Sequence, residues 1–175
     1  STAIGAFTLN NQNFTSATDS FNTAVGYSAG LSVSTGVQNT FIGGLSGDAN
    51  TTASNNTAVG YNTLGANTTG NRNTASGFES LKLNTTGLSN VSIGAYSSNN
   101  NTTASYNVAV GDASFYTNTT GANSVAVGYE ALKANTTASN NTAVGYRSLL
   151  ANTTGGDNTA LGFTALDANT TGASN

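Results

Sequence analysis

Asparagine and threonine are the side chains through which this chain could most readily do chemistry, at 27 and 30 of its 175 residues. Many of them stand in Asn-x-Thr, the acceptor motif for N-linked glycosylation. The candidate glycosylation sites are Asn13, Asn50, Asn67, Asn84, Asn101, Asn118, Asn135, Asn152 and Asn169. A structural role is the alternative, since Asn suits turns and its amide can bond to an identical amide in a stacked repeat.

The paired threonines suggest a second kind of chemistry, the ordering of water. A flat rank of outward Thr hydroxyls could bind ice. Adjacent residues such as Thr153 and Thr154 point to opposite sides of an extended chain, so only one of each pair can face outward. The pattern therefore predicts a single rank, and ice binding is an alternative function.

The residue types exclude most other chemistry. The chain has no His and no Cys, and hence no imidazole base, no thiolate and no soft metal site. We expect no enzyme activity, no metal and no cofactor. Its 4 basic and 7 acidic residues give a net charge of −3, too little basic surface for nucleic acid. No apolar run is long enough for membrane insertion.

A repeat of 17 residues positions these side chains. Glycine returns at that interval from Gly26 to Gly162, and Gly5 stands 21 residues before Gly26. The whole chain, 1–175, is therefore one repeat domain. It consists of a first coil, 1–21, with a four-residue insertion, and nine 17-residue coils, 22–174.

Within each unit, apolar residues alternate as in a β-strand. One unit cannot bury its own apolar side chains, but stacked units can. We predict an all-β protein, a parallel β-solenoid or β-roll of about ten coils. Two core columns are expected, and Ser76 and Ser98 would weaken them. The columns are Val25, Ile42, Val59, Ile93, Val110, Val127, Val144 and Leu161, and Leu64, Leu81, Phe115, Leu132, Leu149 and Leu166.

The intervening Ala and Gly residues would then form a stripe on the outer surface. Small residues allow two backbones to approach, which favours a subunit contact. The alternative is that Gly is needed for a backbone bend. The candidate interface residues are Ala58, Gly60, Ala75, Gly77, Ala109, Gly111, Ala126, Gly128, Ala143 and Gly145.

Charged residues are confined to a few columns of the repeat. Glu130 and Arg147 stand one coil apart and should pair along the rod axis, for a small gain in stability. If exposed, Tyr27, Tyr61, Tyr129 and Tyr146 could stack on surface glycans.

The segment Asn123-Ser124-Val125-Ala126-Val127-Gly128 resembles the Ser-Val-Ala-Ile-Gly signature of trimeric autotransporter adhesin heads of the YadA type. The repeats are also similar to Asn-Thr-Ala-Val-Gly-Tyr repeats of some phage tail fibres and bacterial surface proteins. The adhesin resemblance implies a left-handed β-roll, three chains side by side, and attachment at a cell surface. It implies no individual binding residue.

Together these features predict an extracellular structural fibre or filament segment, on a cell surface or a virion, with an adhesive or coating role. The expected partner is the chain itself, as a homotrimer or a head-to-tail filament. Ser1 and Asn22 open equivalent coils and neither end shows a cap, which favours stacking or a longer array. The alternatives are an ice-binding protein and a phage receptor fibre that binds host or surface glycans.

Overall fold

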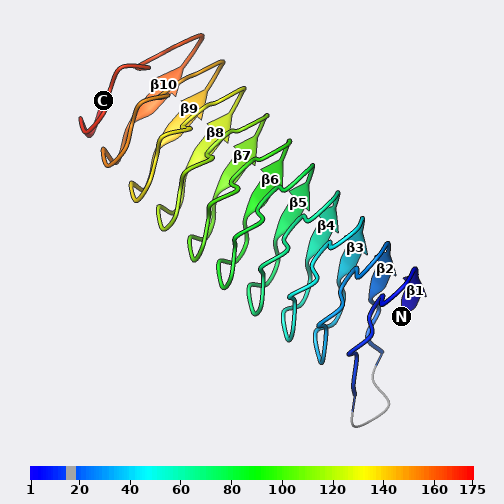
Figure 1. Cartoon of the computed structure of the whole chain (residues 1–175). Coiled ribbons are helices and arrows are strands. Elements are labelled where there is room, and N and C mark those ends of the chain that lie inside the picture. The colour runs from blue at the N-terminus through cyan, green and yellow to red at the C-terminus, as the bar shows by residue number, and fades with distance from the viewer. Residues whose placement is uncertain (15–18) are drawn as a thin grey trace.

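The chain folds as the expected parallel β-solenoid (Figure 1). The computed structural model describes residues 1–14 and 19–175. Its ten strands form one sheet in sequence order, and each pairs in parallel with the next. They are β1 (Thr2–Ile4), β2 (Thr23–Val25), β3 (Thr40–Ile42), β4 (Thr57–Val59), β5 (Thr74–Ser76), β6 (Val91–Ile93), β7 (Val108–Val110), β8 (Val125–Val127), β9 (Thr142–Val144) and β10 (Thr159–Leu161).

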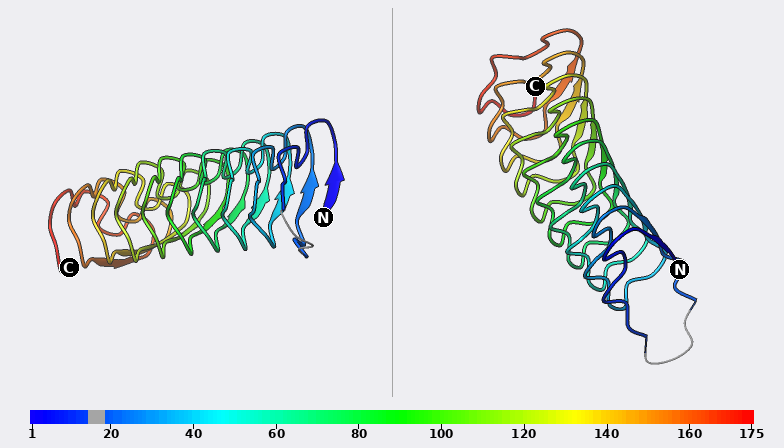
Figure 2. Two further views of the ribbon diagram at one scale, coloured as in Figure 1. Left: turned by 90° about the horizontal axis from the view of Figure 1, so that it is seen from below. Right: turned by 45° about the vertical axis from the view of Figure 1, so that its right-hand side comes forward.

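Equivalent residues of successive coils lie side by side. Ala126 pairs with Ala143 and Val127 with Val144, one 17-residue repeat apart. The offset between β1 and β2 is 21 residues, from Thr2 to Thr23, so the first coil is longer, as expected. The coils stack into a rod with the two termini at opposite ends (Figure 2). At about 4.8 Å per strand, the sheet is roughly 43 Å long. No helix within the described residues is long and apolar enough to cross a bilayer.

The glycine after each strand is fixed by contacts within the rod. These glycines have φ between 128° and 137°, a conformation that L side chains rarely adopt. A Cβ on Gly26 would lie 2.6 Å from the carbonyl oxygen of Gly43 in the next coil. Glycine is therefore required where the chain bends and stacks. This agrees with the alternative explanation of the repeated glycines, a backbone bend.

The strand side chains that point into the coil are the opposite set to the one expected, the Ala positions and not the Val and Ile positions. Ala143 is 0% exposed, whereas its neighbours Thr142 and Val144 are only half-buried. The Val and Ile column predicted as core lies on the outside in every coil. The coil is too thin for it, because Leu side chains and two columns of Asn fill the space opposite the strands and leave room for little more than a methyl group.

The predicted Ala and Gly interface is therefore wrong. All five alanines, Ala58, Ala75, Ala109, Ala126 and Ala143, are 0% exposed inside the coil. The glycines beside them, Gly60, Gly77, Gly111, Gly128 and Gly145, have no room for a side chain against the next coil of the same chain. The whole set contacts its own chain and cannot form the surface of a subunit contact.

The predicted Leu column is confirmed as core. Its members Leu64, Leu81, Phe115, Leu132 and Leu149 are fully buried, and Leu166 in the last coil is exposed. The core is divided into two clusters, which end at Leu81 and resume at Ala109. Ser98 lies in the division, as expected, whereas Ser76 stands on the outside, so its predicted effect on the core is wrong.

One large residue in the core is matched by two small ones. Phe41 takes the place of the inward Ala and is 0% exposed. Gly30 and Gly47 stand where later coils have Leu, and a Cβ on either would overlap the Phe41 ring. The ring fills the volume that the two missing Leu side chains leave.

The first prediction tests the direction of the strand side chains. Ala143→Glu should destabilise the protein by about 4 kcal/mol or more, because it places an unpaired charge inside the coil. Val144→Glu should keep the β signal, since its side chain reaches solvent. Circular dichroism and thermal melting measure both. Equal loss of structure in the two variants would contradict the observed orientation.

The second prediction concerns the match between Phe41 and Gly47. Gly47→Leu should destabilise by about 1–3 kcal/mol through overpacking, although its φ of 57° resembles the 56° of Leu64. Phe41→Ala should cost about 3–5 kcal/mol through an empty cavity. The double variant should recover part of both losses in denaturant unfolding. Simple additivity would show that the two positions are independent.

Candidate functional site

The outside of the sheet is uncharged and largely built from branched side chains. We define the outward face as the first and third residues of strands β1–β10. These positions hold Thr, Val, Ile, Leu and one Ser, and no charged residue stands at any of them. Exposed fractions reach 37% at Val59 and 43% at Ile93 in the middle of the rod. Branched apolar side chains and Thr thus form a repeating, uncharged surface in contact with water.

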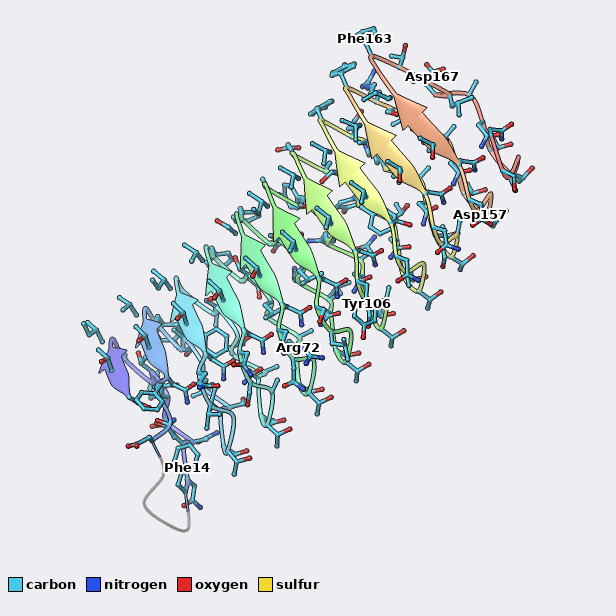
Figure 3. The ribbon with its side chains drawn as sticks, turned by 180° about the vertical axis from the view of Figure 1, so that it is seen from behind. Phe14, Arg72, Tyr106, Asp157, Phe163 and Asp167 are labelled. Carbon is cyan, nitrogen blue, oxygen red and sulfur yellow. The ribbon has the colours of Figure 1, made fainter. Side chains whose placement is uncertain are left out.

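An aromatic rank continues this surface past the glycine bend. It consists of Tyr27, Tyr61, Phe78, Tyr129, Tyr146 and Phe163. The rings of Tyr129 and Tyr146 stack at 5.4 Å, and those of Tyr146 and Phe163 at 5.1 Å. Figure 3 shows Phe163 beyond one end of the strands, and Arg72, Tyr106 and Asp157 along the other edge. All four tyrosines expected as stacking candidates are exposed, so that condition is met.

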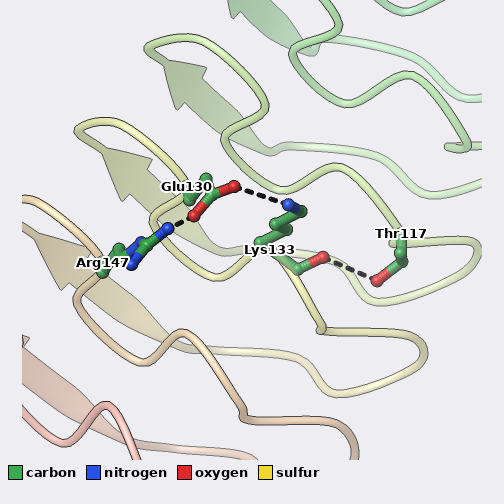
Figure 4. A network of polar contacts seen from close by, with 4 residues as sticks. All are labelled: Thr117, Glu130, Lys133 and Arg147. Carbon is green, nitrogen blue, oxygen red and sulfur yellow. Dashed lines mark hydrogen bonds and ion pairs between the residues drawn. The ribbon is translucent and has the colours of Figure 1, made fainter.

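A charged cluster borders the aromatic rank. Arg147 Nε donates to Glu130 Oε2 at 2.7 Å, and Lys133 Nζ donates to Glu130 Oε1 at 2.6 Å (Figure 4). The expected pairing of Glu130 with Arg147 is therefore confirmed. The bond from Lys133, reinforced by Arg147, lowers the pKa of the Glu130 carboxyl. The Arg147 guanidinium also lies 5.3 Å from the ring centroid of Tyr146.

A hollow of about 420 Å³ opens beside this cluster, lined by Tyr96, Ala113, Tyr116 and Lys133. Two of its lining residues, Tyr96 and Ala113, directly follow Ala95 and Asp112, which stand in place of Tyr or Phe in the aromatic rank. None of the lining residues was predicted as a site. The departures from the repeat at 95, 96, 112 and 116 are visible in the sequence and could have indicated it.

The Asn of the Asn-Thr-Thr turns form a ladder inside the rod. Asn118 Nδ2 donates to Asn101 Oδ1 at 3.0 Å and to the Gly121 carbonyl oxygen at 2.9 Å, and Asn135 Nδ2 donates to Asn118 Oδ1. The structural alternative, bonding between amides of stacked coils, is confirmed. This Asn ladder comprises Asn50, Asn67, Asn84, Asn101, Asn118, Asn135, Asn152 and Asn169.

These contacts contradict the expectation of glycans on the ladder. Asn50 to Asn152 are buried, and both hydrogens of the amide that would carry the sugar are used from Asn67 onward. Asn169 is half-buried in the last coil and makes the same bonds. Asn13 is exposed, but Thr15 of its motif lies outside the described residues. Exposed acceptors with a described motif are Asn55 and Asn140.

The paired threonines divide as expected into one inner and one outer rank. The hydroxyl of Thr119 donates to the carbonyl oxygen of Thr136 in the next coil at 3.1 Å, and this bond recurs along the rod. The second Thr of each pair, such as Thr120 and Thr137, is exposed. In the part of the chain that the structure describes, no three carboxylates gather as a metal site would require.

Comparisons with protein-family models, with curated proteins and with solved structures give no match to this chain. The assignment of a function therefore depends on the surfaces described above.

The third prediction tests the Asn ladder. Asn118→Ala should destabilise by about 2–4 kcal/mol, because it removes bonds to two neighbouring coils and leaves buried partners such as the Asn135 amide unsatisfied. The control is Thr120→Ala in the same coil, whose side chain is exposed and should cost less than about 0.5 kcal/mol. Urea unfolding gives both values. Equal costs would show that the ladder does not stabilise the rod.

Proposed function

We propose that this chain is a non-catalytic structural segment of an extracellular fibre, on a cell surface or a virion, and that it associates with further copies of itself. The observation that carries the proposal is the uncharged outward face, with exposed Val, Ile and Leu side chains along the whole rod. An exposed apolar patch of several hundred square ångströms normally marks an interaction site. The rod supplies length and stiffness, and the outward face supplies the means of assembly.

The occupant of the outward face is a second copy of the chain. With the aromatic rank, the surface measures roughly 43 Å by 13 Å, or about 560 Å² before side-chain relief, which approaches the ~800 Å² per partner of a standard interface. Its strand positions carry no charge to select a charged partner. Because it repeats in every coil, two parallel copies would present the same ridges at the same spacing.

A closed ring of three parallel chains satisfies these surfaces and agrees with the resemblance to trimeric adhesin heads. In such a ring each chain buries its outward face toward the common axis, and assembly stops at a defined number. The exposed Thr rank and the acceptors Asn55 and Asn140 are not part of the outward face. In a host that adds N-glycans, those two asparagines are the positions for them, which would suit a coating role.

The fourth prediction tests the assembly. Val127→Glu combined with Val144→Glu should convert the oligomer to a monomer, since like charges would meet across the contact, while the β signal is retained. Sedimentation velocity measures the mass. The matched control, Thr120→Glu with Thr137→Glu, adds the same charges to the exposed Thr rank and should leave the oligomer intact. A monomeric parent chain, or an unchanged mass in the Val variant, would overturn the proposal.

A further inference from the structure

The hollow is where the outside of the rod departs most from its repeat. Elsewhere an aromatic ring usually follows the glycine bend, but Ala95 and Asp112 leave that place open in two successive coils. Tyr96 and Tyr116 instead place their rings at positions that other coils fill mainly with polar or aliphatic residues. The result is an open space of about 420 Å³, within the range of small-molecule sites.

The two tyrosine rings form the walls of a corner. Their centroids lie 6.4 Å apart and their planes meet at 75°. Tyr96 is 39% exposed, so its ring can accept a ligand. A ring-shaped ligand with one apolar face could lie flat on one tyrosine while its edge meets the other. Aromatic surfaces of this kind combine apolar contact with a polar hydroxyl at the tip.

The polar side of the hollow is held in place. The Lys133 ammonium is fixed by Glu130 at 2.6 Å, and the Lys133 carbonyl oxygen accepts a bond of 2.6 Å from the Thr117 hydroxyl (Figure 4). Arg147 holds the other oxygen of Glu130. The ammonium keeps further hydrogens to donate, and the hydroxyl groups of Tyr96 and Tyr116 can donate and accept. Donors and acceptors therefore border an apolar corner.

From this arrangement we propose that the hollow binds a neutral saccharide, one or two pyranose rings in size. A pyranose has an apolar face of C–H groups and an edge of hydroxyls that donate and accept, which matches the tyrosine corner, the tyrosine hydroxyls and the Lys133 ammonium. Lys133 and Arg147 are both paired with Glu130, so neither cation is free to select an anionic ligand. The binding proposal does not rest on the proposed self-association, because the hollow is formed within one chain.

The test uses the full chain with three probes, cellobiose, maltose and N,N′-diacetylchitobiose, in saturation-transfer NMR. At least one disaccharide should bind with a dissociation constant in the millimolar range. Tyr116→Ala and Tyr96→Ala should each weaken that binding about tenfold, a change of about 1.4 kcal/mol. Tyr61→Ala removes an exposed ring of the aromatic rank away from the hollow and should leave binding unchanged.

Circular dichroism of each variant establishes that the coils are intact, and Lys133→Gln tests the hollow without removing a ring. This variant should also weaken binding. Three results would each overturn the proposal: no transfer to any of the three disaccharides, equal binding in the Tyr96, Tyr116 and Lys133 variants and the parent, or an equal loss in Tyr61→Ala. Binding of free indole without any saccharide would likewise reject a sugar as the ligand.

Discussion

The rod depends on the close approach of each glycine to the glycine of the next coil. A side chain on Gly26 would overlap the carbonyl of Gly43, and its φ of 136° is one that only glycine adopts readily. The same bend therefore recurs at one glycine in every coil and keeps successive coils in register. Once the bends are stacked, every other residue lies beside its own equivalent one coil away. The columns of Ala, Leu, Asn and Thr are consequences of that register.

This register explains how so polar a chain sustains a core. A buried amide is costly unless its hydrogens and its oxygen find partners. In the Asn ladder the partner of Asn118 is an identical amide above and another below, so one solution satisfies every coil. A second interior column of Asn is also satisfied by repetition. The Asn73 side-chain amide donates to the carbonyl oxygen of Gly87, and the Asn73 backbone N–H donates to Asn56 Oδ1 in the preceding coil. Stacked, mutually bonded Asn side chains can therefore fill interior space that apolar side chains would otherwise fill.

The fold could be predicted from the sequence because period and alternation determine it, but the direction of the strands could not. A three-residue strand such as Thr-Ala-Val reads equally well with either side inward, and the larger apolar residues were assigned to the core. The thickness of the coil decides otherwise, since Leu149 from the opposite wall leaves space only for Ala143. Burial of Asn was missed for a related reason, because polar turn residues are usually exposed. The hollow could not be predicted from the sequence without knowing which residues of each coil face outward.

The division between a uniform interior and a varied exterior indicates where specificity resides. Inside, a change in one coil disturbs its neighbours, as the pairing of Phe41 with two glycines shows. Outside, the corner before each strand holds exposed residues as different as Arg72, Tyr106 and Asp157 (Figure 3). The outward face is exposed yet regular, with Thr or a branched apolar residue at all but one of its positions. Stacking within one chain contributes to this regularity too, because β-branched side chains lie beside their equivalents one coil away. The self-association proposed above would use the same regular spacing.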